Sequence, residues 1–192
     1  MKYLIDRASA ITPKDSLDDL LKSKKSLRIK LGVDPTAPDV TLGWYAILRA
    51  LRKFQDYGHT AVLILGEFTA QVGDPSGKSE TRTQLEENQI DDNSKGVLPI
   101  IKNILNKENL EIVSNKDWLS KLSTSELVHL SSSTTLAQML ERDDFANRYK
   151  DGNPISLTEF FYPLFQGYDS VAVKADIAVS YTHLRAHETI AD

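Results

Sequence analysis

The sequence contains no cysteine. A disulfide framework and a thiolate zinc site are therefore excluded, and the absence is compatible with a cytoplasmic protein. Long hydrophobic runs are also lacking, because stretches such as AVLIL and WYAIL fall far short of the ~20 residues that a membrane helix needs. The N-terminal segment MKYLIDRASA has no long apolar region of the kind that signal peptides carry. We therefore expect a soluble, cytoplasmic protein that does not span a membrane.

A strong excess of charge of one sign is lacking as well. The formal net charge is -4 over 192 residues, which argues against a strongly basic nucleic-acid module but leaves a local basic patch open. Hydrophobic residues make up 41% of the chain, enough to form the packed core of one domain.

Segments typical of strands and of helices alternate along the chain. LRIKLGV alternates apolar and polar residues, as a strand does, and TAVLILG has the continuous apolar pattern of a strand covered on both faces. A helix is predicted from about Leu42 to Tyr57, with Gly58 as its stop. Further on, VLPIIKNILNK predicts a helix and LEIV a short strand. This alternation predicts an α/β fold in which helices cover both faces of a parallel sheet.

Four more features complete the predicted organisation. The segment 66–82 is predicted as a long polar loop, which is either mobile or functional. Capping-box patterns at Ser123–Glu126 and Ser156–Glu159 predict two helix starts. The segment 135–150 is predicted to be helical in two pieces. His59 and His129 are interpreted as structural or exposed.

Three segments hold more polar side chains than packing requires. The first, DPTAPDVTLGW, follows a predicted strand and enters a helix, where a parallel sheet places its ligands. The second is GEFTAQVGDPSGK. In the third, Tyr162, Gln166 and Asp169 are spaced to share one face of a helix. Such a stripe could bind a small polar ligand or belong to a buried structural network, and the sequence pattern leaves both open.

Two weaker patterns partly match a phosphate-binding loop and a histidine metal site. VGDPSGKS is similar to a phosphate-binding loop, but Gly73 and Gly77 have three residues between them where the motif needs four. Lys78 could still meet a phosphate or be a surface lysine. His183 and His187 are spaced to share a helix face, yet no metal site is predicted, for the reason given below.

The chain resembles bacterial tyrosyl-tRNA synthetases over roughly residues 13–178. The resemblance rests on KLGVDPTAPD, GEFTAQVGDPSGKSETR, MLERDDFANRY and SLTEFFYPLFQGYDSVAVKAD, in that order and spacing. It implies a class I enzyme with a Rossmann-type catalytic domain, usually a homodimer. Such an enzyme uses ATP and Mg²⁺ to activate tyrosine as tyrosyl-adenylate and then transfers the tyrosyl group to tRNA(Tyr). No tightly bound cofactor is implied.

The resemblance also implies roles for single residues in binding tyrosine. Asp34 would lie in the tyrosine pocket beside the adenylate. Asp74, Tyr162 and Gln166 would hold the substrate ammonium. Asp169 would accept a hydrogen bond from the substrate phenol, and Asn115 would support the pocket.

For the nucleotide, the resemblance places Thr36 near the phosphates and Lys78 on a loop that closes over them. The family signature has two histidines around an apolar-Gly pair; here Thr41 and Trp44 stand in place of the histidines, with Leu42 and Gly43 between them. Gly43 still permits close approach of the nucleotide, whereas Thr41 and Trp44 can donate hydrogen bonds but cannot become cations as histidines can. We therefore expect reduced but real adenylate formation in an intact enzyme.

A second departure from many relatives is Lys30, so the phenol pocket is expected to be built differently. The resemblance ends near Ala178. The following VSYTHLRAHET looks like the translation of a sequencing adapter, so residues 1–178 are expected to be an incomplete catalytic domain and 179–192 a non-native tail. His183 and His187 would then have no metal role. On this interpretation the chain is a fragment that cannot aminoacylate tRNA by itself.

Two other functions stay open at the level of sequence. A non-catalytic paralogue would bind tyrosine or a nucleotide without exchange activity, as the TLGW segment allows. A P-loop-like nucleotide hydrolase or kinase is disfavoured by the glycine spacing.

Overall fold

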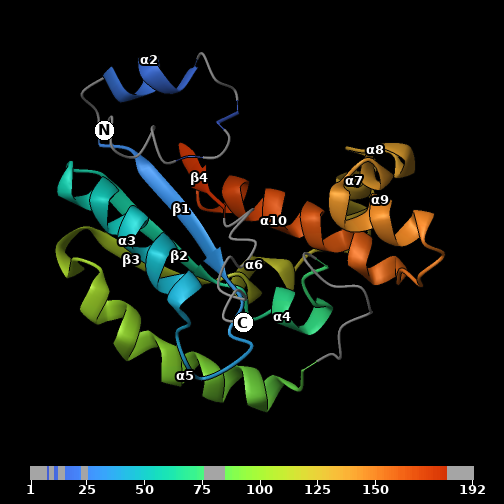
Figure 1. The fold of residues 1–192 in the computed structure, drawn as a ribbon, viewed down its shortest axis with the longest axis horizontal. Coiled ribbons are helices and arrows are strands. Elements are labelled where there is room, and N and C mark those ends of the chain that lie inside the picture. The colour runs from blue at the N-terminus through green and yellow to red at the C-terminus, as the bar shows by residue number, and fades with distance from the viewer. Residues whose placement is uncertain (1–7, 9–10, 13–15, 23–25, 76–84, 181–192) are drawn as a thin grey trace, which may run out of the picture.

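The computed structural model describes residues 8, 11–12, 16–22, 26–75 and 85–180. Within them the chain forms a four-stranded, entirely parallel sheet in the order β3-β2-β1-β4 (Figure 1). The predicted α/β fold with a parallel sheet is thus confirmed. The strands are β1 (Arg28–Val33), β2 (Thr60–Leu65), β3 (Leu110–Ser114) and β4 (Ile177–Val179).

The two long helices of the first half cover one face of the sheet. They are α3 (Leu42–Asp56), which joins β1 to β2, and α5 (Glu87–Ile104), which lies between β2 and β3 in the chain (Figure 1). Their buried side chains meet the alternate apolar residues of β1 in the main core. Those core residues include Leu27, Ile29, Leu31, Val33, Leu48, Leu51, Val97 and Ile101.

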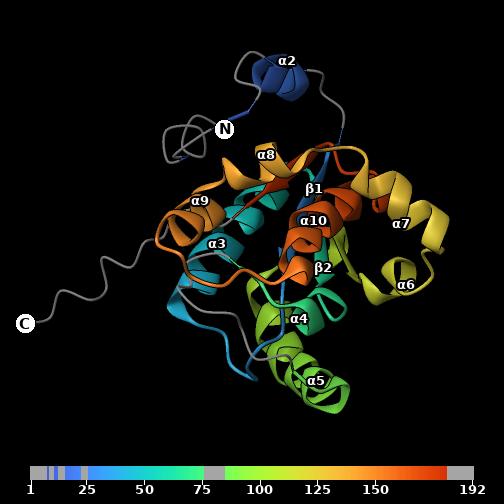
Figure 2. The ribbon, with the colours of Figure 1, turned by 90° about the vertical axis from the view of Figure 1, so that its right-hand side faces the viewer.

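Helix α10 (Phe161–Ala172) lies on the other face of the sheet, as Figures 1 and 2 show. Val62 and Ile64 of β2 point to this side and pack with Val173 and Trp118. Because β2 is covered on both sides, every residue from Ala61 to Leu65 is buried. Helices on both faces, and a β2 strand buried on both, are therefore confirmed.

Two predicted boundaries were wrong. Helix α5 begins at Glu87, ten residues before the predicted start, because Glu86 and Gln89 form a capping box and the polar first turns carry little apolar periodicity. The predicted loop 66–82 contains a short helix, α4 (Thr69–Val72). The remainder of that loop from residue 76 to 82 lies outside the described residues.

The segment between β3 and α10 is built of short helices. Both predicted capping boxes, at Ser123 and Ser156, are confirmed, and so is the helix in two pieces, α8 and α9. No helix in the described part of the chain is long and apolar enough to cross a membrane. The shorter elements are α2 (Ser16–Lys22), η1 (Lys107–Asn109), α6 (Lys116–Leu119), α7 (Thr124–Ser131), α8 (Leu136–Leu140), α9 (Asp143–Lys150) and η2 (Leu157–Phe160).

Candidate functional site

Two polar residues and a glycine directly follow the ends of β1, β2 and β3. Asp34 comes after β1, Gly66 after β2 and Asn115 after β3. Backbone hydrogen bonds continue the sheet pattern one step further, from the Gly66 amide to the Val33 carbonyl (2.8 Å) and from the Asn115 amide to the Leu65 carbonyl (3.0 Å). Because the strands are parallel, these residues meet at one edge of the sheet.

A hydrogen-bonded chain joins two carboxylates across this edge. The Thr69 hydroxyl donates to Asp34 Oδ1 at 2.7 Å, and Asn115 Nδ2 donates to Thr69 Oγ1 at 3.0 Å. The same Asn115 amide lies 3.3 Å from Asp169 Oδ2. Asn115 is completely buried, and its Oδ1 accepts from the Phe68 amide at 2.9 Å. Three side-chain contacts thus hold Asn115 in the network, and its supporting role in a tyrosine pocket stays a prediction.

Helix α10 completes the network from the opposite side. The Tyr162 hydroxyl donates to Asp34 Oδ2 at 3.0 Å, and the Trp118 indole N–H donates to Asp169 Oδ1 at 2.9 Å. Tyr162 and Asp169 lie seven positions, or two turns, apart along the helix, so both can face the sheet. Two residues of the predicted stripe, Tyr162 and Asp169, therefore belong to one polar network, whereas the third, Gln166, is exposed.

Burial and nearby charges shift the pKa values of Tyr162 and Asp169, which lie at the two ends of this network. The pKa of the Tyr162 phenol is raised well above its ordinary value by burial, and further by the negative charges of Asp34, Asp74 and Asp169. Tyr162 therefore stays protonated and donates to Asp34. Burial also raises the pKa of Asp169, while the Trp118 N–H, Lys30 and Asn115 oppose that rise. Three carboxylates around one phenol create a negative field suited to a cation.

Gly66 is required by the close approach of the network. A Cβ atom on this residue would overlap the Asp34 carboxylate and would lie 2.5 Å from the Thr69 hydroxyl. Both atoms belong to hydrogen-bonded side chains, so neither can move without breaking the Asp34–Thr69 bond. A glycine here is thus part of the site and not only of a turn.

The proline-containing loop after β1 is held by α5. Asn93 Nδ2 donates to the Pro35 carbonyl at 3.0 Å, and a Cβ atom on Gly96 would lie 2.7 Å from the Pro38 carbonyl oxygen. Thr36 is half-buried within this loop, and its amide donates to the Asp34 carbonyl at 2.8 Å. The loop is therefore supported along its length, which fixes Asp34 at its start.

The residues at the start of α3 have local partners. Thr41 is the N-cap of the helix, and its hydroxyl oxygen accepts from the Trp44 amide at 3.3 Å. Trp44 packs its side chain partly against the main core, and Gly43 is half-buried beside it. The catalytic roles of these three residues stay predictions.

The remaining predicted residues are placed as follows. Asp74 is half-buried and close enough to Tyr162 to affect its pKa. Gln166 is exposed on α10 between Tyr162 and Asp169. Lys78 lies outside the described residues, as do His183 and His187. Of the other histidines, His129 is exposed, while His59 is buried and its Nδ1 accepts from the Leu27 amide at 3.3 Å.

Two residues of the network were missed by sequence reasoning. Thr69 lies inside a segment that was singled out as polar, but nothing in its spacing showed that its hydroxyl would bridge Asp34 and Asn115. Trp118 follows Asn115 by three residues, so a helical turn after β3 could have pointed to it.

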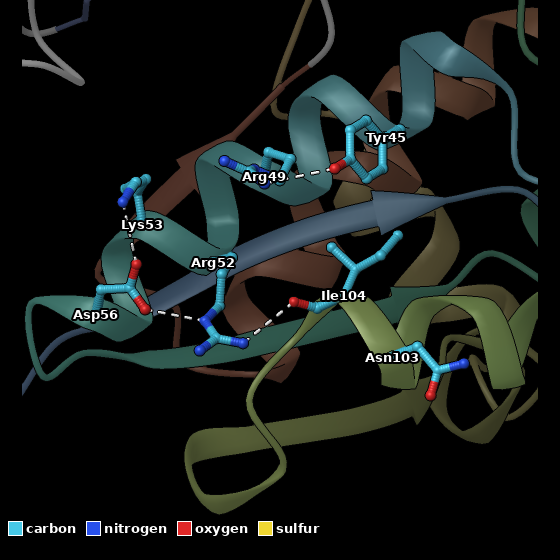
Figure 3. A pocket seen from close by; sticks show the side chains of 7 residues that line it. All are labelled: Tyr45, Arg49, Arg52, Lys53, Asp56, Asn103 and Ile104. Carbon is cyan, nitrogen blue, oxygen red and sulfur yellow. Dashed lines mark hydrogen bonds and ion pairs between the residues drawn. The ribbon is translucent and has the colours of Figure 1, made fainter.

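A hollow on the surface of α3 is separate from this network. Its volume is about 420 Å³, and Figure 3 shows basic side chains of α3 facing the end of α5. Arg52 and Lys53 both pair with Asp56, and Arg49 lies over the Tyr45 ring. None of the predicted site residues lines it, and its cations already have partners, so the network at the strand ends is the candidate site.

Comparisons with known proteins identify the family of the chain. Residues 22–180 match the family described as tRNA synthetases class I (W and Y). The tyrosine–tRNA ligase of Carboxydothermus hydrogenoformans is 49% identical over 176 residues, which cover 90% of this chain and 43% of that protein. That of Thermotoga maritima is 47% identical over 182 residues, covering 95% and 45%.

Solved structures give the same result. A truncated mitochondrial tyrosyl-tRNA synthetase of Coccidioides posadasii is 26% identical with a TM-score of 0.71, covering 90% of this chain and 50% of that one. The tyrosyl-tRNA synthetase of Archaeoglobus fulgidus, solved with L-tyrosine, has a TM-score of 0.70 at 20% identity, a likeness of fold alone.

The fold is that of an α/β protein with a parallel sheet, and its candidate site lies at the carboxyl ends of the strands. The chain belongs to the class I tRNA synthetase family of the tryptophan and tyrosine enzymes. It spans less than half the length of the tyrosine–tRNA ligases that it matches.

Proposed function

We propose that this chain forms the tyrosine-binding part of a tyrosine–tRNA ligase, which activates tyrosine with ATP and transfers it to tRNA(Tyr) in the cytoplasm. The observation that carries the proposal is the buried Asp169, held by Asn115 and Trp118 beside the acidic surroundings of Tyr162. A substrate phenol can donate to Asp169, while the substrate ammonium is attracted by Asp34 and Asp74. A buried polar partner of this kind favours tyrosine over an apolar side chain.

The nucleotide half of the reaction involves the predicted residues near the start of α3. ATP would approach Gly43 closely, with Thr36, Thr41, Trp44 and Lys78 as partners of its phosphates and sugar. Mg²⁺ would arrive as the counter-ion of ATP, which makes it part of the substrate. Preorganised donors are what a developing negative charge on phosphate requires.

We also propose that the full-length protein is a homodimer. Large apolar side chains are exposed between α7 and η2, a region that packing within the chain leaves open to solvent. A second copy is the partner that such a surface would fit. The exposed side chains are Val128, Leu136, Tyr149 and Leu157.

Calorimetric titration of the 192-residue chain with L-tyrosine tests the tyrosine site. We expect saturable binding that is weakened about 10- to 100-fold in Asp169→Asn, because a charge-assisted hydrogen bond becomes a neutral one. Asp56→Asn is the matched control, since Asp56 is exposed on α3 and away from the network. Absence of tyrosine binding by the unaltered chain would overturn the proposal.

A second candidate is a non-catalytic paralogue that binds tyrosine without activating it. One observation favours it: the Thr41 hydroxyl caps α3 and the Trp44 side chain packs against the core, so both have structural uses. Tyrosine-dependent exchange of pyrophosphate into ATP separates the two functions. Exchange above background by the full-length protein indicates a ligase, whereas tyrosine binding with background exchange indicates the paralogue.

A further inference from the structure

Three alternate residues at the end of β1 differ in their side chains: Lys30 carries a cation, Gly32 has no side chain, and Asp34, directly after the strand, carries an anion. Side chains alternate along a strand, so Lys30, Gly32 and Asp34 project to the same side. That side faces α10, because Lys30 bonds to the Gln166 carbonyl and Asp34 to the Tyr162 hydroxyl. Gly32 is exposed although it lies in a central strand, and a Cβ atom there would meet only Lys30 Cε, at 3.9 Å. The sheet is therefore open to a ligand between Lys30 and Asp34.

Lys30 brings a buried ammonium to one end of this opening. The residue is 4% exposed, and its Nζ donates to the Gln166 carbonyl at 2.9 Å and to the Ser170 hydroxyl at 3.2 Å. A lysine ammonium has three N–H donors, and within the described part of the chain Nζ has only these two acceptors. Burying a charge of this kind is costly unless its donors are satisfied, so the third N–H is suited to a ligand acceptor.

Asp169 provides the complementary acceptor next to it. Lys30 Nζ bonds to Ser170, the residue after Asp169 on α10, and the Asp169 charge opposes the fall in the pKa of Lys30 that burial causes. Each Asp169 oxygen already accepts one bond, from Trp118 or Asn115, and a carboxylate oxygen has room for another. A donor and an acceptor side by side match a hydroxyl group, which both donates and accepts.

We propose that Lys30 is a specificity-determining residue that donates a hydrogen bond to the oxygen of the substrate phenol, while Asp169 accepts the phenol proton. This inference rests on the proposed tyrosine site and adds a second partner to it. Phenylalanine would leave a Lys30 N–H and an Asp169 lone pair buried without partners, whereas tyrosine satisfies both.

The test compares ligands in a variant that keeps the length of the side chain. Calorimetry with L-tyrosine and L-phenylalanine measures their affinity ratio in the unaltered chain, in Lys30→Met and in Lys53→Met. We expect the ratio to fall about 10-fold or more in Lys30→Met, the usual effect of losing one charge-assisted bond. Lys53→Met, which removes an exposed ion pair with Asp56, should leave the ratio unchanged.

A third ligand distinguishes the donor from the acceptor. The amino group of 4-amino-L-phenylalanine can donate to Asp169, but its nitrogen is a poor acceptor for Lys30. Its affinity should therefore fall less than that of tyrosine in Lys30→Met. If that variant does not fold, as judged by circular dichroism, the unaltered chain still decides the matter, because tyrosine should bind about 10-fold more tightly than 4-amino-L-phenylalanine.

The outcomes separate this inference from the function on which it rests. If the unaltered chain binds no tyrosine, the proposed function fails. If it binds tyrosine but Lys30→Met keeps the ratio of tyrosine to phenylalanine, the inference about Lys30 is wrong and the tyrosine site stands. Equal affinity of the unaltered chain for tyrosine and 4-amino-L-phenylalanine would likewise overturn the role of Lys30.

Discussion

At the scale of single residues, the proposed role of Lys30 would exchange stability for specificity. Desolvation lowers the pKa of its buried ammonium, and the attraction of Asp169 recovers only part of that loss. Asp169 is perturbed in the opposite direction, since burial raises the pKa of its carboxyl group. Burial thus disfavours the charged form of both residues, as is common at functional sites.

Replacing Lys30 by methionine should therefore stabilise the protein at neutral pH. The pKa of Lys30 in the folded state is lower than its ordinary value of 10.5. The cost of burying the ammonium is therefore present at lower pH and disappears once the pH exceeds 10.5. We expect Lys30→Met to raise the free energy of unfolding at pH 7.5, because the Asp169 carboxylate keeps its hydrogen bonds from Trp118 and Asn115 when the ammonium is removed. The gain should shrink as the pH approaches 10.5.

Urea denaturation at several pH values between 7 and 10 measures this effect. Lys53→Met serves as the control, because Lys53 is partly exposed. The difference in free energy of unfolding between Lys53→Met and the unaltered chain should not show this dependence on pH. If Lys30→Met is instead less stable than the unaltered chain, by an amount that grows as the pH falls, then the charge of Lys30 is favourable in the folded state and the prediction is wrong.

Among the elements, α9 and η2 depend on one buried ion pair. Arg148 on α9 and Glu159 on η2 are each 3% exposed, and Arg148 Nη1 lies 2.5 Å from Glu159 Oε2. Arg148 also donates to the Pro154 carbonyl in the turn that joins the two elements. Glu159 in turn accepts from the Ser156 amide in the predicted capping box, so the pair fixes the start of the segment that leads into α10.

Loss of the arginine should be severe because it leaves a buried carboxylate without its cation. We expect Arg148→Met to lower the free energy of unfolding by about 3–5 kcal/mol, and the double variant with Glu159→Met to recover much of that loss. Lys95→Met, which removes an exposed pair with Asp92, should leave the free energy of unfolding nearly unchanged, because solvent screens that pair. Denaturant melts of the four proteins measure this, and equal losses for Arg148→Met and Lys95→Met would contradict it.

Across the whole molecule, Arg28 links parts of the chain that are distant in sequence. It lies at the start of β1, opposite the end that carries the site. Its guanidinium forms two bonds to Glu111 of β3, at 2.6 and 2.7 Å, and a third to the Val173 carbonyl. Its backbone amide donates to Asp176 just before β4. The hydrogen bond from Arg28 accordingly lowers the pKa of Glu111.

Removing this link should weaken the fold without changing the site. The Arg28 and Glu111 side chains are 34% and 44% exposed, so solvent screens the pair and we expect Arg28→Met to cost only about 1 kcal/mol. Tyrosine affinity should stay within about twofold, because distant sites that share no partners are coupled by well under 1 kcal/mol. Paired urea and calorimetric titrations check both values, and a large fall in affinity would mean that the two ends are coupled.

Much of this protein was determined by local sequence. Alternating residues in 27–33 and the apolar run 60–65 predicted β1 and β2, and capping residues predicted where the later helices begin. These features depend on neighbours within a few positions, which is why the sequence revealed them. Where that local signal was weak, as in the polar first turns of α5, the predicted boundary was wrong.

The contacts that make the site were decided only by tertiary structure. Tyr162 is 128 residues from Asp34, and Asp169 is 54 from Asn115, yet each pair shares a hydrogen bond. Periodicity placed Tyr162 and Asp169 on one helix face but could not show which strand end that face would meet. Likewise it could not show that Thr69 would bridge two carboxylates. Those contacts depend on strand order and on where α10 packs, because a hydrogen bond forms only within about 3.5 Å and local sequence does not fix distances across a sheet.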